Sequence, residues 1–188
     1  MSRFAQYTRA NAPEASRPLL DQLDKALGFV PNLFATVAES PAVLGGALAL
    51  DAALDKGTLS AVERQLVKIA VSTENACTYC VAAHSTLAGM LKARPDVVNA
   101  VRTGAPVDDK KTHALIHFTR AVVQEKGFVR EEEIAAFLAA GYTKGQLLEV
   151  AGHVAAKTLQ NYIHALTKAP LDEQFQPQQW EAEQLKVA

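Results

Sequence analysis

Apolar residues recur at helical spacing along almost the whole chain, in segments bounded by residues that begin and end helices. Ser40 stands before Pro41, an order typical of an N-cap followed by proline at the first helical position. Ser60 and Glu63 have the spacing of a capping box, and Gly28 follows another apolar segment where a helix would end. No stretch shows the sustained alternation of a β-strand. The sequence therefore predicts an all-α fold.

The composition also favours closely packed helices over a sheet. Hydrophobic residues make up 49% of the chain and aromatic residues only 6%, so the apolar side chains are mainly small and helix-favouring. We expect about eight to ten helices in a single domain. The expected helical segments are residues 14–27, 41–54, 60–74, 77–92, 95–102, 109–126, 131–140 and 143–168.

The charge balance argues against binding to nucleic acid or to an anionic membrane. The net charge is −1 and the pI is about 6.5, so neither polyanion is attracted over long range. No apolar run approaches the roughly 20 residues of a membrane span. The first residues lack the apolar stretch of a secretory signal. We therefore expect a soluble, cytoplasmic protein.

The two cysteines of the chain, Cys77 and Cys80, form a Cys-x-x-Cys pair, and His84 follows four residues later. In a reducing compartment such a pair is more often catalytic or metal-binding than a structural disulfide. Asn75 is expected to cap a helix, which would place Cys77 in its first turn, where free backbone N–H groups favour a thiolate. His84 shares a helix face with Cys80 and can accept its proton.

This arrangement suits the reduction of a peroxide. A cysteine thiolate that attacks a peroxide becomes a sulfenic acid, and the second cysteine then condenses with it to form a disulfide. A dithiol reductant restores both thiols. The pattern thus indicates a dithiol–disulfide cycle at Cys77 and Cys80.

Residues 64–68, together with Asn75, Cys77, Cys80 and His84, resemble the core of the AhpD-like alkylhydroperoxidases. These proteins belong to the carboxymuconolactone decarboxylase family. The close resemblance covers residues 59–93, which we take as the redox core. A looser resemblance in helix order extends over a helical domain of residues 1–170, with 171–188 left as a C-terminal tail or docking arm.

The resemblance implies an all-helical oxidoreductase that reduces alkyl hydroperoxides without haem, metal or other cofactor. It implies a homo-oligomer, a trimer or a multiple of three, that an external dithiol or a thiol reductant protein recycles. In that family the second cysteine is peroxidatic, the first is resolving and the histidine is the base, which map to Cys80, Cys77 and His84. The helix dipole alone would favour Cys77 as the more acidic thiol, so the two arguments disagree. We expect Cys80 to be the peroxidatic cysteine, because it is the one nearer to His84 in the sequence.

The chain departs from the family pattern at the proton relay. Family members that have this relay carry a glutamate twelve residues before the first cysteine, where this chain has Gln65. The best-studied relay also has a histidine just before the second cysteine, where this chain has Tyr79. Glu63 and Glu74 are the nearest acids that could replace the missing carboxylate. As alternatives, Glu63 completes the capping box and Glu74 is a surface charge at a helix end.

Four other interpretations of the cysteine pair remain open. One is a redox-sensing or disulfide-exchange protein with little peroxidase turnover, which the absence of a glutamate at Gln65 favours. Another is a zinc site, although a structural zinc needs four ligands and no second Cys or Cys/His pair with suitable spacing follows. The third is the lactone decarboxylase chemistry of the family, which does not depend on a cysteine pair. Cys77 and Cys80 could also be inert buried side chains.

The remaining histidines give weaker signals. His113 and His117 have the spacing of a metal-binding pair, but no glutamate follows His113 as in zinc proteases, so solvated or core histidines are expected. His153 and His164 lie eleven residues apart on one helical stripe and are expected to line a helix interface.

Overall fold

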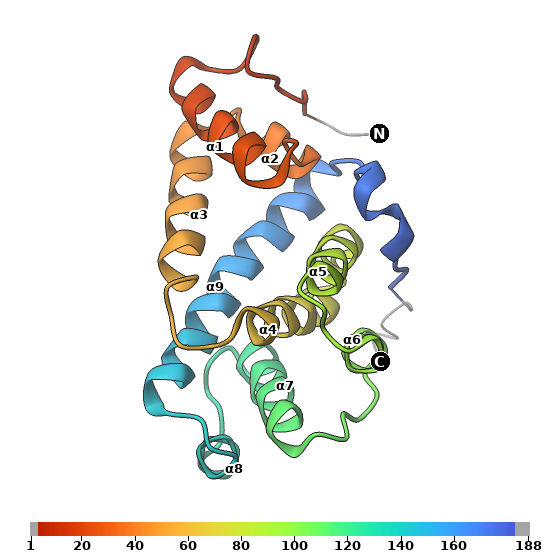
Figure 1. Cartoon of the computed structure of the whole chain (residues 1–188). Coiled ribbons are helices and arrows are strands. Elements are labelled where there is room, and N and C mark those ends of the chain that lie inside the picture. Colours follow the sequence, from red (N-terminus) through yellow and green to blue (C-terminus); the bar gives the residue numbers. More distant parts are fainter. Residues whose placement is uncertain (1–3, 183–188) are drawn as a thin grey trace.

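The computed structural model describes residues 4–182, and within them it confirms the expected all-α fold (Figure 1). Between residues 4 and 182 the chain forms nine α-helices and two short 3-10 helices, and eight of these α-helices match the expected segments. The elements are η1 (Glu14–Ser16), α1 (Arg17–Leu27), α2 (Asn32–Val37), α3 (Pro41–Leu54), α4 (Ala61–Glu74), α5 (Thr78–Met90), α6 (Pro95–Thr103), α7 (Lys110–Gln124), α8 (Glu131–Ala139), α9 (Lys144–Thr167) and η2 (Glu173–Gln178).

The predicted helix starts are confirmed by their side-chain hydrogen bonds. The Ser60 hydroxyl accepts from the backbone N–H of Glu63, and the Glu63 carboxylate accepts from the backbone N–H of Ser60. Thr143 and Gln146 form the same reciprocal box at the start of α9, and Ser40 caps α3. These bonds satisfy backbone donors that a helix start otherwise leaves free.

Helix α4 lies at the centre of the molecule and packs against α5, α7 and α9 (Figure 1). Because helices surround it, its residues 66–72 are all buried. Helices α1, α2 and α3 form a second group at one side, with α3 running beside α9. The thiol site lies where this group meets α5. No helix among residues 4–182 is both long and apolar enough to cross a membrane.

The connection between α4 and α5 differs from the expected one. Asn75 does not begin α5 but ends α4, Ala76 adopts a left-handed backbone with φ of 50°, and Cys77 occupies the N-cap position of α5. The Asn75 side chain is turned away from α5, because its amide donates to the Asn161 carbonyl oxygen on α9, 3.0 Å away. Consequently the first turn of α5 contains Cys80 rather than Cys77.

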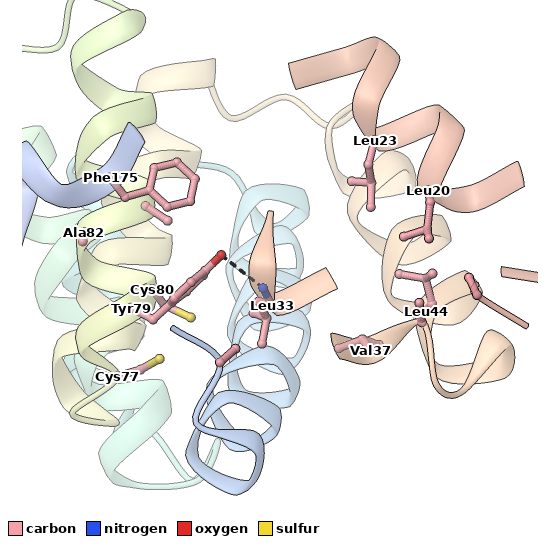
Figure 2. Packing of buried hydrophobic residues seen from close by; sticks show 14 residues of the cluster. Leu20, Leu23, Leu33, Val37, Leu44, Cys77, Tyr79, Cys80, Ala82 and Phe175 are labelled. Atoms are coloured by element: carbon pink, nitrogen blue, oxygen red, sulfur yellow. Dashed lines mark hydrogen bonds between the residues drawn. The ribbon is translucent and has the colours of Figure 1, made fainter. Parts of the chain in front are cut away.

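The described part of the C-terminal tail packs on α5 and ties it to α2. Asp172 accepts hydrogen bonds from the backbone N–H of Asn32 at 2.9 Å and from the Tyr79 hydroxyl at 2.5 Å. The Tyr79 hydroxyl in turn accepts from the backbone N–H of Leu33, the dashed line in Figure 2. Phe175 of η2 packs edge-on against the Tyr79 ring. These contacts hold the first turn of α5 in place.

Candidate active site

A cavity of about 530 Å³ lies between the α1–α3 group and helices α4, α5 and α9. Cys80 lines it, whereas Cys77 is buried behind the wall of the cavity. The two thiols are unpaired and lie on the same end of α5 (Figure 2). The lining combines apolar side chains with the polar groups described below. The apolar lining residues include Leu23, Leu27, Phe29, Leu33, Phe34 and Leu48.

The two thiols differ in acidity. Burial by itself raises the pKa of Cys80, but a hydrogen bond from the Cys77 thiol, the charge of Lys157 and a hydrogen bond from Asn161 together lower it to about 6. The pKa of Cys77 is raised because it donates this hydrogen bond to Cys80, is buried and faces the negative charge of Cys80. Cys80 also lies in the first turn of α5, where the helix dipole favours a thiolate. These interactions favour a thiolate at Cys80 over a thiolate at Cys77.

His84 lines the same cavity and bonds to the residue that departs from the family pattern. Its Nδ1 lies 2.8 Å from the side-chain oxygen of Gln65 on α4. Its Nε2 lies 2.6 Å from Nζ of Lys157 on α9. Burial, followed by the positive charges of Lys157 and Lys68, holds the pKa of His84 well below its usual value. Both ring nitrogens are thus engaged with groups other than Cys80, and His84 is not placed as its direct base.

A chain of polar side chains continues from His84 across the cavity. Lys157 donates to the carbonyl oxygen of Gln160, and the Gln160 amide donates to Asp51 on α3 at 2.6 Å. Asp51 also forms an ion pair with Lys68, 3.1 Å away. Burial raises the pKa of Asp51, but the charges of Lys68 and Lys157 outweigh this effect and lower it. The cavity therefore contains a carboxylate, although it comes from α3 and not from α4.

The two acids considered as relay replacements lie elsewhere, which corrects that expectation. Glu63 is held by Ser60 in the capping box and accepts a hydrogen bond from the Tyr142 hydroxyl at 2.8 Å. Glu74 forms an ion pair with Arg120 on α7. Neither side chain lines the cavity.

Tyr79 lines the cavity, and its hydroxyl is hydrogen-bonded within the fold. Its ring forms part of the cavity wall, while its hydroxyl is used by Asp172 and Leu33. Burial and the hydrogen bond to Asp172 raise its pKa. Tyr79 therefore does not replace the relay histidine of the family, because its hydroxyl proton is held by Asp172.

The other histidines lie outside the cavity. His113 and His117 are exposed and stack on each other. His153 is fully buried on α9, and burial together with the charge of Lys68 lowers its pKa to about 4. His164 packs against the Tyr79 ring. Within residues 4–182, no cluster of three or more His, Cys, Asp or Glu side chains is arranged to hold a metal ion.

Comparison with known proteins matches the middle of the chain to a family. The carboxymuconolactone decarboxylase family matches residues 41–120, which include both cysteines and His84. No curated protein matches the sequence.

Several solved structures share the fold. An uncharacterized peroxidase-related protein from Ralstonia eutropha JMP134, described as an alkylhydroperoxidase AhpD core, is 26% identical with a TM-score of 0.84, over 93% of this chain and 94% of that one. A peroxidase-related protein from Silicibacter sp. TM1040 is 18% identical with a TM-score of 0.79, over 92% of each chain. The debrominase Bmp8, whose cysteine-to-alanine variant was solved with 2,3,4-tribromopyrrole, is 17% identical with a TM-score of 0.81, over 95% of this chain and 96% of that one.

The Cys-x-x-Cys pair lies at the start of α5, inside the segment of residues 41–120 that matches the family. The all-helical fold is shared with the AhpD core over most of the chain. Residues 41–120 of the chain thus match the carboxymuconolactone decarboxylase family, and the chain has the fold of the AhpD core.

Proposed function

We propose that the protein is a thiol-dependent peroxidase that reduces alkyl hydroperoxides through a dithiol–disulfide cycle of Cys77 and Cys80. The observation that carries this proposal is the acidic thiol of Cys80, which lines a cavity with an apolar wall and has a second thiol hydrogen-bonded to it. The apolar wall suits the alkyl group of a hydroperoxide, and the thiolate suits its oxygen. The peroxidase-related relatives are consistent with this assignment.

The cycle has three balanced steps. The Cys80 thiolate attacks the terminal oxygen of the hydroperoxide, so that an S–O bond forms, the O–O bond breaks and the alkoxide takes a proton to leave as an alcohol. Cys77 then attacks the sulfenic sulfur of Cys80, and water leaves as the disulfide forms. An external dithiol exchanges with this disulfide and returns both cysteines to thiols, becoming oxidised itself.

The proposal predicts catalytic consumption of a small alkyl hydroperoxide in the presence of a dithiol. One equivalent of hydroperoxide without dithiol should convert the reduced protein to an internal Cys77–Cys80 disulfide, measured by intact mass and by peptide mapping. Excess dithiol should then support many turnovers, followed as loss of hydroperoxide. Consumption no faster than with dithiol alone would rule the peroxidase out.

Oxidation without turnover would instead favour the redox-sensing function. Two observations support this second candidate: the relay glutamate is replaced by Gln65, and both sulfurs are nearly inaccessible, with Cys80 1% and Cys77 4% exposed. A sensor would form the disulfide in proportion to added peroxide and return only slowly to the thiol form. Its oligomeric state would also change on oxidation, which a sizing column would detect.

The fold shared with a debrominase adds a second electron acceptor, a brominated ring, to the test. The aromatic side chains Phe29, Phe34 and Phe175 of the cavity suit a flat halogenated ring. Two thiols can replace a carbon-bound bromine with hydrogen, releasing bromide and a proton and forming one disulfide. Bromide release from a brominated pyrrole that exceeds the rate of peroxide reduction would favour this activity.

We also propose that the chain forms a homo-oligomer, a trimer or a multiple of three, through the outer face of α9. Leu148, Leu159, Tyr162 and Leu166 are exposed on this face at helical spacing, with Tyr162 60% and Leu166 65% exposed. Burying such a stripe of large apolar side chains is favourable. Light scattering should give three times the chain mass of 20.2 kDa, or a multiple of that trimer mass, and Leu166→Glu should lower it. A monomeric wild-type protein would contradict the proposal.

A further inference from the structure

Lys157 is a buried ammonium group in the wall of the thiol cavity. It extends from α9 and is only 3% exposed. Its Nζ bonds to two neutral acceptors, Nε2 of His84 and the side-chain oxygen of Gln160. A lysine ammonium has three N–H donors, so two are engaged by these side chains and one remains for the cavity.

The two carboxylates of the cavity are already paired with other cations. Asp51 forms its ion pair with Lys68 at 3.1 Å, and Asp55 forms one with Arg64 at 3.2 Å. Across residues 4–182, Lys157 has no carboxylate oxygen within ion-pair distance. Asp51 acts on Lys157 only through its charge and not through a direct ion pair, so a further negative group in the cavity would stabilise the buried ammonium.

The acidic group that shares the cavity and lacks a cation of its own is the thiol of Cys80. Its hydrogen-bond neighbours are the Cys77 thiol and the Asn161 amide, which are neutral donors. Lys157 and Cys80 therefore complement each other: one is a cation without a direct ion pair, and the other is an acid whose anion is already hydrogen-bonded.

His84 cannot be the cation that stabilises the Cys80 thiolate while Lys157 is charged. Because an ammonium only donates, Nε2 of His84 must be the acceptor and must carry no proton. The ring proton is then on Nδ1, where it is donated to the side-chain oxygen of Gln65. The imidazole is thus a neutral acceptor that fixes the position of Lys157.

We infer that Lys157 is the cation that holds Cys80 as a thiolate and that its free N–H group protonates the leaving alkoxide, with His84 and Gln160 positioning the ammonium. The second half of this inference rests on the proposed peroxidase function, whereas the first half does not. As Cys80 attacks, the O–O bond breaks and the alkoxide takes a proton from Lys157, which becomes a neutral amine. When a dithiol later restores the Cys80 thiol, that thiol returns its proton to Lys157.

The first half is tested by the alkylation of Cys80 with iodoacetamide as a function of pH, in a Cys77→Ser background whose hydroxyl keeps the hydrogen bond to Cys80. The midpoint of the alkylation profile should lie near 6 with Lys157 present. In Lys157→Met it should rise to at least the ordinary thiol value of about 8.5, so alkylation at pH 7 should slow about 30-fold. Lys157→Arg, which keeps the charge, should restore most of the rate.

Two further variants separate this inference from its alternatives. Lys68→Met removes the lysine of the same cavity that is paired with Asp51, and the midpoint of Cys80 alkylation in this variant should stay low. His84→Gln keeps an acceptor near Lys157 and should also stay low, whereas it would rise if His84 were the partner of Cys80. Thermal unfolding of each variant confirms that it is folded. An unchanged midpoint in folded Lys157→Met, or a raised midpoint in folded His84→Gln, would overturn the inference.

The proton-delivery half is tested with a hydroperoxide at a pH well above the raised midpoint of Lys157→Met. There the variant has a full thiolate, so a single-turnover rate that remains below wild type indicates the missing proton donor. A rate equal to wild type would overturn this half. Because alkylation needs no peroxide, a protein without peroxide turnover but with the expected Lys157 effect would refute the peroxidase function and leave the thiolate assignment intact.

Discussion

Replacing Cys80 with serine is expected to reduce hydroperoxide consumption to the rate measured without protein. A serine hydroxyl is not ionised at neutral pH, and its oxygen cannot form the sulfenic acid and disulfide that carry the two electrons. The Cys77 thiol does not replace it, because Cys77 does not line the cavity and burial by itself still raises its pKa once Cys80 is gone. The loss should therefore be complete.

Cys77→Ser is the matched control because it removes one sulfur and leaves the attacking one. This variant should still react with one equivalent of hydroperoxide, and a dimedone adduct should map to Cys80. Turnover with dithiol should be slower than in wild type, since no internal disulfide protects the sulfenic acid. Stopped-flow loss of hydroperoxide and intact mass measure both reactions. Equal single-turnover rates for Cys80→Ser and wild type would show that Cys80 is not the attacking sulfur.

The fold was largely predictable because capping residues and glycines in the sequence mark where most of its helices begin and end. The boxes at Ser60 and Thr143 and the glycines that follow other helices gave boundaries close to the observed ones. Helix α2 (Asn32–Val37) was not predicted, since six residues make less than two turns and show no helical period. Its position depends instead on tertiary contacts, including the hydrogen bond from Asn32 to Asp172 near the far end of the chain.

The sequence placed Cys80, His84 and Gln65 in one site, and the structure brings all three to one cavity. It misplaced the start of α5, because the Asn75 amide is used by Asn161 rather than by the helix that follows. With Cys77 at the N-cap, the helix dipole favours Cys80 rather than Cys77 as the thiolate. The histidine argument does not hold, because both ring nitrogens of His84 bond to Gln65 and Lys157.

Lys157 and Asp51 were not predicted as site residues because they lie on helices far from the cysteines in sequence. One signal was present: Lys157 falls seven residues after Val150 and four after His153, on the buried face of α9. A lysine at a core position needs an anion or an opening to solvent. Without the fold, however, nothing indicated that the thiol of Cys80 would face it.

Asp51→Asn is expected to lower the free energy of unfolding by about 3–5 kcal/mol at pH 7. The carboxylate is the ion-pair partner of buried Lys68, and its charge also stabilises buried Lys157. An asparagine can still accept from Gln160, so the change chiefly removes the negative charge. The remaining lysine is then a buried charge without a partner, which explains the size of the effect.

The exposed pair of Arg9 and Asp21 provides a matched control. Asp21→Asn removes the same charge from an ion pair at 2.7 Å whose side chains are 73% and 46% exposed, and should cost no more than about 1 kcal/mol. Urea unfolding followed by circular dichroism measures both variants. Equal losses in Asp51→Asn and Asp21→Asn would show that the cavity carboxylate does not compensate buried charge.

The pH dependence gives an independent check on the Asp51 charge. Its pKa is lowered in the folded protein, so its contribution to stability is present above the unfolded value of about 3.9 and is lost as the pH falls through the lower folded value. The difference between wild type and Asp51→Asn should therefore be constant from pH 7 down to about 5 and should narrow below about 4. A difference that persists unchanged at pH 3 would attribute the loss to packing rather than to charge.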